Sequence, residues 1–292
     1  MPELPEIEAY LSALEARIVG ATLYRVRIVS FSLLRTVDPA AESTEGREVT
    51  GVHRIGKRVA IDLDNDLHLV IHLMVAGRFK WFEEPKPVPK RGGLAAFDFS
   101  TGSLLLTEAG TKRRASLSIV TDAGMTDLDP GGLELAGATV EEFRNALLTE
   151  RHTLKRALTD ARYLSGIGGA FADEILHSAR LSPTQMNTNL SDVEIATLFD
   201  AARSILDTWT SRRIEETGEG FPEKVTAFHP DMAVHGKFGE PCPQCGVPIQ
   251  KIEAGARETN YCPGCQTSGR ILADRSLSRL LKDDWPKTVE EL

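Results

Sequence analysis

Residues 235–266, HGKFGEPCPQCGVPIQKIEAGARETNYCPGCQ, contain all four cysteines of the chain, arranged as the CxxC pairs Cys242/Cys245 and Cys262/Cys265. Each CxxC places two thiolates in one tight turn, and two such turns joined by a hairpin complete a tetrahedral four-sulfur site. The spacing therefore predicts one structural Zn²⁺, with two redox disulfides or unrelated free thiols as the alternatives. Because a closed thiolate shell has no open coordination position, we expect the metal to fold this segment and to take no part in catalysis.

The segment between the two CxxC pairs carries Arg257, five residues before Cys262. On the predicted hairpin its guanidinium would project outward, and that planar group suits a bidentate contact with a phosphate. We assign residues 235–270 to a zinc finger and residues 271–292 to a C-terminal extension. The confinement of the cysteines to one short segment also favours a reducing, intracellular compartment.

Upstream of the zinc finger, residues 135–225 have the pattern of a helical domain. Two capping-box pairs, Thr139 with Glu142 and Ser191 with Glu194, mark helix starts. Between them the glycine-rich turn at residues 164–169 (LSGIGG) connects helical stretches at 154–158 and 170–179. A helix, a glycine turn and a second helix can present backbone N–H groups to a phosphate, although such turns also serve as plain connectors.

Residues 1–125 begin with an amphipathic helix and continue as short strands. Behind Pro5, apolar residues recur at helical spacing as far as Ile18, and Gly20 supplies the stop. Short alternating or β-branched runs follow at 24–28, 59–63, 67–73, 97–99, 104–106 and 117–120. Asp64-Asn65-Asp66, between the second and third of these runs, predicts a tight hairpin turn. We therefore expect an α+β protein: an N-terminal β-sandwich with a leading helix, a helical domain and a zinc-binding β-hairpin.

The charge of the chain restricts how it can meet nucleic acid. A formal net charge of −8 over 292 residues excludes a uniformly basic coat, so any contact with DNA must be local. Two basic patches exist, Lys112-Arg113-Arg114 and Arg151-His152 with Lys155-Arg156, and either can also be an ordinary solvated face. The sequence lacks the run of about 18 apolar residues that a membrane span needs, so we expect a cytoplasmic protein without membrane contacts.

The N-terminus offers a nucleophile once the initiator methionine is removed. The nitrogen of Pro2 then becomes a secondary amine, and an α-amino group of ordinary pKa about 7.7 to 8.0 is partly deprotonated near neutral pH. Such an amine can attack a sugar C1′ and form an iminium that stays cationic and accepts electrons. Glu3 follows directly and could shuttle protons. Read alone, MPELPE would be an acidic helix cap.

In the order and spacing of its motifs, the chain resembles the formamidopyrimidine-DNA glycosylase and endonuclease VIII family, the helix-two-turn-helix DNA glycosylases. The resemblance covers nearly the whole chain. Its PELPE start is closer to the formamidopyrimidine branch than to the endonuclease VIII branch. The matching motifs are MPELPEIE (1–8), RIGKRVAIDL (54–63), LSGIGGAFADEILHSARLSP (164–183), HGKFGEPCPQCG (235–246) and ETNYCPGCQ (258–266).

The resemblance implies a bifunctional DNA glycosylase and abasic-site lyase of base excision repair. Its substrate would be duplex DNA with an abasic site or an oxidised base, such as the purine lesions formamidopyrimidine and 8-oxoguanine. The protein would be a monomer, nucleoid-associated if bacterial. Pro2 would be the nucleophile, Glu3 the acid/base, Lys57 a phosphate or leaving-group contact, and Arg257 a phosphate contact. The candidate DNA-binding residues are Met74, Arg113, Arg114, Lys155 and Gly169.

Several positions depart from the family pattern. Gly169 and Phe171 stand where the family commonly has asparagine and tyrosine, so a side-chain contact with phosphate is lost and backbone N–H groups remain. The family's void-filling methionine falls on Val75, with Met74 one position earlier. The arginine-arginine-phenylalanine wedge that fills the space of a flipped nucleotide ends here in Ala115.

Two other functions stay open on the sequence alone. A catalytically weak or inactive member of the family would bind damaged or abasic DNA without cleaving it, as the altered glycine turn and wedge permit. A zinc-ribbon protein would bind RNA or another protein through its C-terminus and would not need Pro2.

Overall fold

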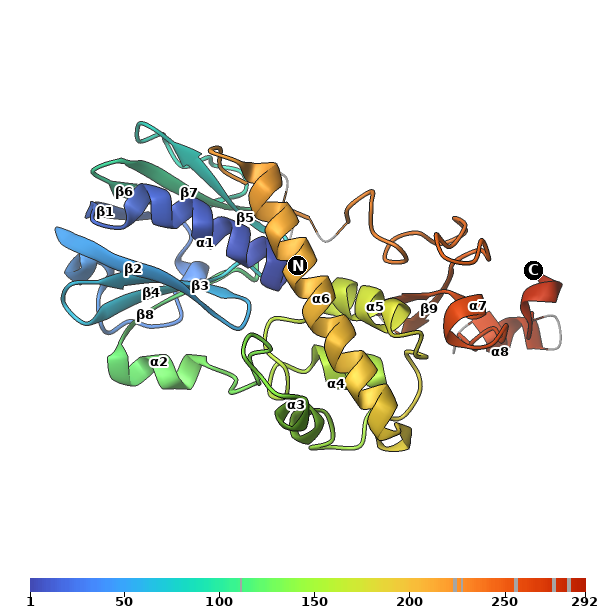
Figure 1. Ribbon diagram of the computed structural model, residues 1–292. Coiled ribbons are helices and arrows are strands. Elements are labelled where there is room, and N and C mark those ends of the chain that lie inside the picture. Colours follow the sequence, from blue (N-terminus) through green and yellow to red (C-terminus); the bar gives the residue numbers. More distant parts are fainter. Residues whose placement is uncertain (111, 223–224, 227, 255–256, 275–276, 283–284) are drawn as a thin grey trace. The chain divides into compact units, whose positions relative to one another are not determined.

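Figure 1 traces the computed structural model, which describes residues 1–292 apart from residues 111, 223–224, 227, 255–256, 275–276 and 283–284. The chain forms two compact units. The first contains residues 1–130 and 209–227, and the second contains residues 131–208 and 228–292. The predicted leading helix and strands therefore fall in the first unit, and the glycine turn and cysteines fall in the second.

The first unit opens with helix α1 (Leu4–Ile18), as predicted. Glu3 caps it in a capping box with Glu6, and a proline at the first turn suits the fixed φ needed there. The apolar residues at helical spacing are buried without exception: Ile7, Tyr10, Leu14 and Ile18 are each 0% exposed. Burial of this face fixes the start of the chain against the strands behind it.

Eight antiparallel strands form two four-stranded layers, β5-β7-β6-β1 and β2-β3-β4-β8, joined where β1 pairs with β2 over two residue pairs. The predicted sandwich is therefore confirmed, as is the tight turn at Asp66, whose φ is 58° between β3 and β4. The strands are β1 (Thr22–Ile28), β2 (Arg47–Ile55), β3 (Arg58–Leu63), β4 (Leu67–His72), β5 (Gly77–Phe82), β6 (Gly93–Phe99), β7 (Gly102–Glu108) and β8 (Ser116–Thr121).

Five elements of this unit were not predicted. The apolar residues of β2 recur every third position, which departs from the alternation that marks a strand, and β5 alternates only at Phe79 and Trp81. Helix α2 (Asp122–Leu128) has no fully buried residue, and its Met125 and Leu128 pack on Ile55, Ala60, Val70 and Val120. The short 3₁₀ turns η1 (Phe31–Leu33) and η2 (Ala41–Thr44) connect β1 to β2.

The second unit contains the predicted helices. Both capping boxes are present: the Thr139 hydroxyl accepts the Glu142 N–H at 3.2 Å, and Ser191 does the same for Glu194 at 3.3 Å. The helices are α3 (Val140–Leu147), α4 (Leu154–Thr159), α5 (Gly169–Ser178) and α6 (Asp192–Thr217), with η3 (Asn187–Asn189) before α6. Helix α6 continues without a break from the second unit into the first, which it enters at Trp209.

The cysteine segment forms the predicted hairpin. Strands β9 (Gln250–Ala254) and β10 (Arg257–Tyr261) pair in antiparallel fashion, and α7 (Pro263–Gln266) holds the second CxxC pair. The chain ends in α8 (Leu277–Leu281) and η5 (Val289–Glu291). No helix among the described residues combines the length and apolar character that crossing a membrane requires.

Candidate active site

The N-terminus of the chain is enclosed rather than free. Pro2 is buried, Glu3 is 3% exposed and Glu6 is 1% exposed. The backbone N–H of Glu3 donates to Glu6 Oε2 at 2.9 Å, which holds the residue after Pro2 on the first turn of α1. In the chain with Met1 the Pro2 nitrogen lies in a peptide bond, and removal of Met1 exposes it as a secondary amine at this enclosed position.

The burial of the N-terminus favours an uncharged amine. Burial lowers the pKa of the N-terminal amine, which belongs to Met1 in the full chain, and Arg78 and Lys57 lower it further. Glu3 and Glu6 act in the opposite direction. The net shift is downward, so the deprotonated, nucleophilic form is more abundant at neutral pH than in a free peptide.

Lys57 lies in the turn between β2 and β3, directly after Gly56, whose φ of 58° is one that glycine adopts without strain. Burial lowers the pKa of Lys57, and the charge of Glu3 partly offsets that shift. The structure thus brings Pro2, Glu3 and Lys57, predicted separately from the sequence, within electrostatic reach of one another.

His72 belongs to the same cluster and was missed by sequence reasoning. It is the last residue of β4 and pairs with Arg58, the neighbour of Lys57. Burial together with the charges of Arg58 and Lys57 lowers the pKa of His72 to about 4, and its Nε2 is buried with no hydrogen-bond partner among the described residues. A neutral imidazole with an unused ring nitrogen beside two cations is a candidate phosphate contact. A histidine ending a strand gives no sequence signal of this.

The turn between β4 and β5 decides how Met74 and Val75 lie. Met74 is half-buried with φ 53°, so it forms part of the turn and does not continue the alternation of β4. Val75 is 60% exposed. At Gly77 a Cβ atom would approach the Leu73 carbonyl oxygen to 2.2 Å, so this tight turn requires glycine. The structure therefore presents Val75, more than the predicted Met74, to a ligand.

Arg113 and Arg114 are both exposed and lie between β7 and β8. The carboxylate of Glu108, itself 2% exposed, accepts the Arg114 N–H at 2.9 Å and the Ala115 N–H at 3.1 Å. The backbone is fixed while the two guanidinium groups stay available. Ala115 is 3% exposed and faces the interior, so it does not extend the pair into a wedge.

In the second unit, Gly169 is the exposed first residue of α5. Its φ is not in the left-handed region, and a Cβ atom added there would meet no atom within 4 Å. The glycine at this exposed helix start is therefore not required by its backbone conformation, and a side chain fits there.

Lys155, the other DNA-binding candidate of this unit, is an internal contact in the structure. Its ammonium donates to Asp173 Oδ1 at 2.6 Å and to the Glu258 carbonyl oxygen at 2.7 Å. Its charge is thus largely balanced by Asp173.

The carboxylates of Asp173 and Glu174, both on α5, form hydrogen bonds with the segments around the cysteine hairpin. Asp173 is 0% exposed and its carboxylate also contacts His235 Nδ1 at 2.9 Å and the Asn260 N–H at 3.1 Å. The Glu174 carboxylate accepts three consecutive backbone N–H groups, those of Ala233, Val234 and His235, at 2.8 to 2.9 Å. Helix α5 therefore holds both the approach to the hairpin and strand β10.

The four cysteine Sγ atoms lie within 4.8 Å of one another. Cys245 and Cys262 are 3.3 Å apart, and Cys242 and Cys265 are 3.9 Å apart. A tetrahedron with Zn–S distances of about 2.3 Å has sulfurs roughly 3.8 Å apart, so the donor set fits zinc. Backbone N–H groups of Gln244 and Cys265 point to sulfurs at 3.4 Å, as thiolates require.

Arg257 is exposed at the first position of β10. Within the described part of the chain no carboxylate lies within ion-pair distance of its guanidinium. Its charge is available to a ligand, as the sequence predicted for a phosphate contact.

Comparison with protein-family models matches three segments. Residues 1–115 match the formamidopyrimidine-DNA glycosylase N-terminal domain, residues 132–217 the formamidopyrimidine-DNA glycosylase H2TH domain, and residues 239–267 a zinc finger found in FPG and IleRS. Together with the sulfur geometry, the third match shows that the four cysteines hold one structural zinc ion. The predicted cofactor is confirmed.

The chain is also similar to whole proteins. The formamidopyrimidine-DNA glycosylase of Heliobacterium modesticaldum is 33% identical over 91% of this chain and 100% of the relative. That of Carboxydothermus hydrogenoformans is 32% identical over 91% and 100%. Lactococcus lactis formamidopyrimidine-DNA glycosylase bound to DNA containing an AP site matches with a TM-score of 0.79 at 24% identity, over 90% of this chain and 99% of that chain. MutM in complex with DNA containing carbocyclic 8-oxo-G matches with a TM-score of 0.79 at 25% identity, over 91% and 99%.

Proposed function

Because the chain belongs to the formamidopyrimidine-DNA glycosylase family, we propose that it excises oxidised bases from duplex DNA with Pro2 as nucleophile and then cleaves the strand. It is a DNA glycosylase of base excision repair, as its resemblance to the family implied. The observation that supports the assignment of Pro2 is its buried position next to Glu3 and near Lys57, at an N-terminus where burial lowers the pKa of the Met1 amine of the full chain.

The proposed reaction balances with groups present at the N-terminus. The lone pair of the Pro2 nitrogen bonds to C1′ while the bond from C1′ to the base breaks, and that electron pair leaves with the base, which takes up the proton that the nitrogen loses. The C1′–O4′ bond then opens to an iminium, and Glu3 gives O4′ its proton. With no N–H left on nitrogen, the iminium stays cationic. Loss of a C2′ proton and elimination of the 3′ phosphate then cleave the strand.

The proposed DNA contacts come from both units. Lys57 and His72 lie beside the N-terminus, and the unused His72 nitrogen supports a phosphate contact there. Arg113 and Arg114 stand on a fixed backbone, which supports a role in filling the space of an extruded nucleotide. Arg257 and Gly169, both exposed, are the further candidate contacts with the DNA backbone. Duplex DNA with a damaged base or an abasic site is the partner.

Borohydride trapping tests the assignment. The protein without Met1 is incubated with duplexes holding an oxidised purine, an oxidised pyrimidine or an abasic site, and reduction should join Pro2 covalently to C1′. Mass spectrometry of the N-terminal peptide locates the bond. Trapping strongest with the oxidised purine would support the lesion class; trapping with none of the three would contradict the proposal.

A catalytically weak DNA-binding protein is the second candidate. It is favoured by two observations: Gly169 offers no side chain at the start of α5, and Ala115 is turned into the interior. Tight binding to abasic DNA with neither base release nor strand nicking would establish it. Trapping followed by nicking would exclude it.

Replacing Gly169 with asparagine should tighten binding to abasic DNA by about tenfold. The new amide would add one hydrogen bond to a charged phosphate, worth roughly 1.5 kcal/mol. The side chain fits because no atom lies within 4 Å of the added Cβ and the backbone needs no glycine. The measurement is a fluorescence-anisotropy titration at fixed salt concentration.

Gly169→Ala is the matched control for this variant. It adds the Cβ and the same reduction of backbone freedom but no polar group, so its affinity should stay near that of the wild type. Equal affinities for the asparagine and alanine variants would show that the side-chain amide contributes nothing.

We also propose that the protein acts as a monomer in the cytoplasm, associated with the nucleoid in a bacterium. The placement of Pro2, Glu3, Lys57 and the cysteine hairpin in one chain supports a single copy as the active species. Light scattering of the complex with an abasic duplex should give one chain per duplex, and a mass of two chains would contradict it.

A further inference from the structure

A buried ion pair joins α1 to the last turns of α6. Arg213 Nη2 lies 3.4 Å from Glu6 Oε1, although 207 positions separate the two residues in the sequence. The Arg213 side chain is 11% exposed and that of Glu6 is 1% exposed. The same Nη2 donates to the carbonyl oxygen of Thr226 at 3.0 Å. Because burying two charges is costly, a pair so enclosed calls for a reason beyond the attachment of a helix.

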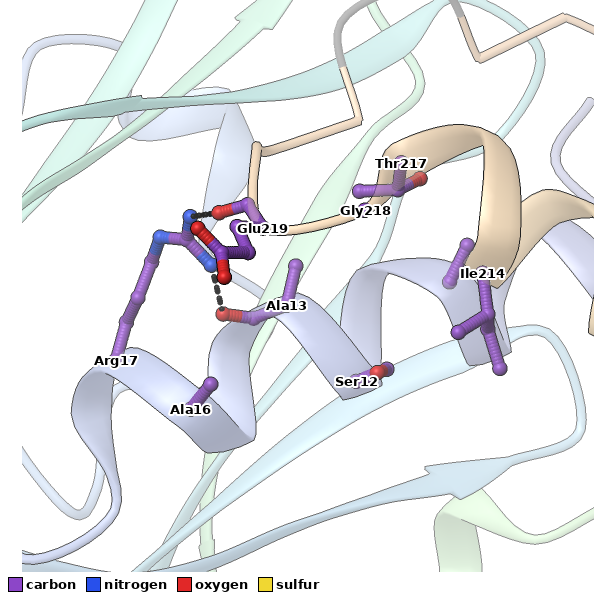
Figure 2. Close-up of a pocket in the computed structure, with 9 residues that line it drawn as sticks. Ser12, Ala13, Ala16, Arg17, Ile214, Thr217, Gly218 and Glu219 are labelled. Atoms are coloured by element: carbon purple, nitrogen blue, oxygen red, sulfur yellow. Dashed lines mark hydrogen bonds between the residues drawn. The ribbon is translucent and has the colours of Figure 1, made fainter.

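A second contact attaches the end of α6 and needs no buried charge pair. Figure 2 shows α1 beside the last residues of α6, with Arg17 donating to the carbonyl oxygens of Ala13 and Glu219. The groove between these two helices, about 450 Å³ in volume, is lined by small α1 residues and by Ile214. Arg17 anchors the segment after α6 through its bond to the Glu219 carbonyl oxygen. Anchoring of this segment therefore does not account for the ion pair between Glu6 and Arg213.

Glu6 transmits the effect of Arg213 to the nucleophile. While Oε1 of Glu6 faces Arg213, its Oε2 accepts the backbone N–H of Glu3 at 2.9 Å. Glu3 is the residue bonded to Pro2, so two contacts separate the guanidinium from the peptide unit that carries the catalytic amine. An ionised carboxylate accepts both contacts more strongly than a neutral one.

Glu6 changes its ionisation state near neutral pH. Burial raises its pKa to about 7, the negative charge of Glu3 raises it too, and the charge of Arg213 opposes both. Removing that opposing charge would raise the pKa further and leave Glu6 mostly protonated at pH 7. The charged or titratable groups that act on Glu6 and Arg213, or share their surroundings, are Glu3, Tyr10, the N-terminal amine, Lys57, Arg78 and Glu216.

We propose that Arg213 is a positioning residue for the nucleophile: by keeping Glu6 ionised and in place, it fixes the Glu3 backbone and the Pro2 amine for attack on C1′. The inference rests on the proposed role of Pro2. Arg213 itself touches neither substrate nor reacting atoms, so its removal acts on the chemical step and leaves DNA binding unchanged.

Arg213→Gln removes the charge and keeps a side-chain donor, and Arg212→Gln is its matched control. Arg212 is the preceding residue of α6, contacts Glu216 at 2.8 Å and lies over the Trp209 ring, as Arg213 also does. Comparison of the two variants therefore isolates the contact with α1 from the general loss of one positive charge on the helix.

The experiment measures single-turnover base release and borohydride trapping from pH 6 to 9 with full-length protein lacking Met1. Arg213→Gln should be slower by about fivefold at pH 7 for a gain of one pKa unit at Glu6, because the ionised fraction of Glu6 then falls from about one half to about one tenth. The loss should shrink as the pH rises and Glu6 ionises. Arg213→Lys should recover most of the rate, Arg212→Gln should match the wild type, and abasic-DNA affinity should stay constant.

Rates equal to those of Arg212→Gln at every pH would overturn the inference, as would a loss that is the same at all pH values. Carboxyl-¹³C NMR of labelled glutamate gives a second readout without DNA: the titration midpoint of Glu6 should move upward in Arg213→Gln, and an unmoved midpoint would also overturn it. If the wild type forms no covalent adduct, the role of Pro2 fails instead, and the NMR comparison still tests whether Arg213 controls Glu6.

Discussion

Replacing Pro2 with glycine is expected to reduce single-turnover base release by about 10³-fold or more, equivalent to about 4 kcal/mol of barrier. Glycine also permits removal of Met1, so the variant still carries an amine at its N-terminus. That amine is primary, and the imine it forms can lose its remaining N–H proton and become neutral. The electron sink that drives ring opening and strand cleavage is then lost. The amine also loses the proline ring that fixes its position in the enclosed N-terminus.

Borohydride trapping on abasic and oxidised-purine duplexes measures this effect, with intact mass confirming that Met1 is absent. Pro5→Gly is the matched control: it makes the same exchange on the first turn of α1, weakens the helix start and leaves the amine unchanged. It should keep trapping. If Pro2→Gly forms an adduct as readily as Pro5→Gly, and peptide mass spectrometry places that adduct away from residue 2, Pro2 is not the nucleophile.

Replacing Cys262 with serine is expected to remove zinc and to unfold the cysteine hairpin. Cys262 is 0% exposed, and its sulfur lies 3.3 Å from that of Cys245. A serine hydroxyl does not ionise near neutral pH and binds zinc weakly. Structural zinc sites contribute roughly 10 to 16 kcal/mol to folding, far more than a four-residue helix and a two-stranded hairpin recover without metal.

Metal content should fall from one zinc per chain to none, and affinity for abasic DNA should fall by about tenfold or more because Arg257 loses its support. Gln244→Ala, an exposed change inside the first CxxC, should keep its zinc. The first unit should retain its thermal transition in both variants. A serine variant that still carries one zinc, or that binds DNA as tightly as the wild type, contradicts this account.

The sequence predicted best those features that depend on neighbours along the chain. The capping boxes at Thr139 and Ser191 use residues three positions apart, and the CxxC pairs bring their own geometry. The hairpin turn at Asp66 is equally local. Such local patterns do not depend on tertiary contacts, so they could be predicted from the sequence alone.

The features that escaped prediction are made by tertiary contacts. Glu6 pairs with Arg213, which follows it by 207 positions in the sequence. Nothing in the sequence around either residue indicates that the two form a pair. His72 became a candidate only because Arg58 and Lys57 surround it in space. In the sequence Lys155 belongs to a basic run. In the structure its charge is balanced by Asp173, which comes from another helix. Burial and pairing decide the role of a charged residue, and the sequence does not give either.

The contacts of Asp173 and Glu174 have a thermodynamic consequence. These two carboxylates bind helix α5 to the approach and to the second strand of the cysteine hairpin. Zinc release and local opening of α5 are therefore linked equilibria, and linkage is reciprocal. A ligand that stabilises folded α5 tightens zinc binding by the same free energy with which zinc tightens binding of that ligand. The chelator concentration that removes half of the zinc is thus a measure of how stably α5 is folded.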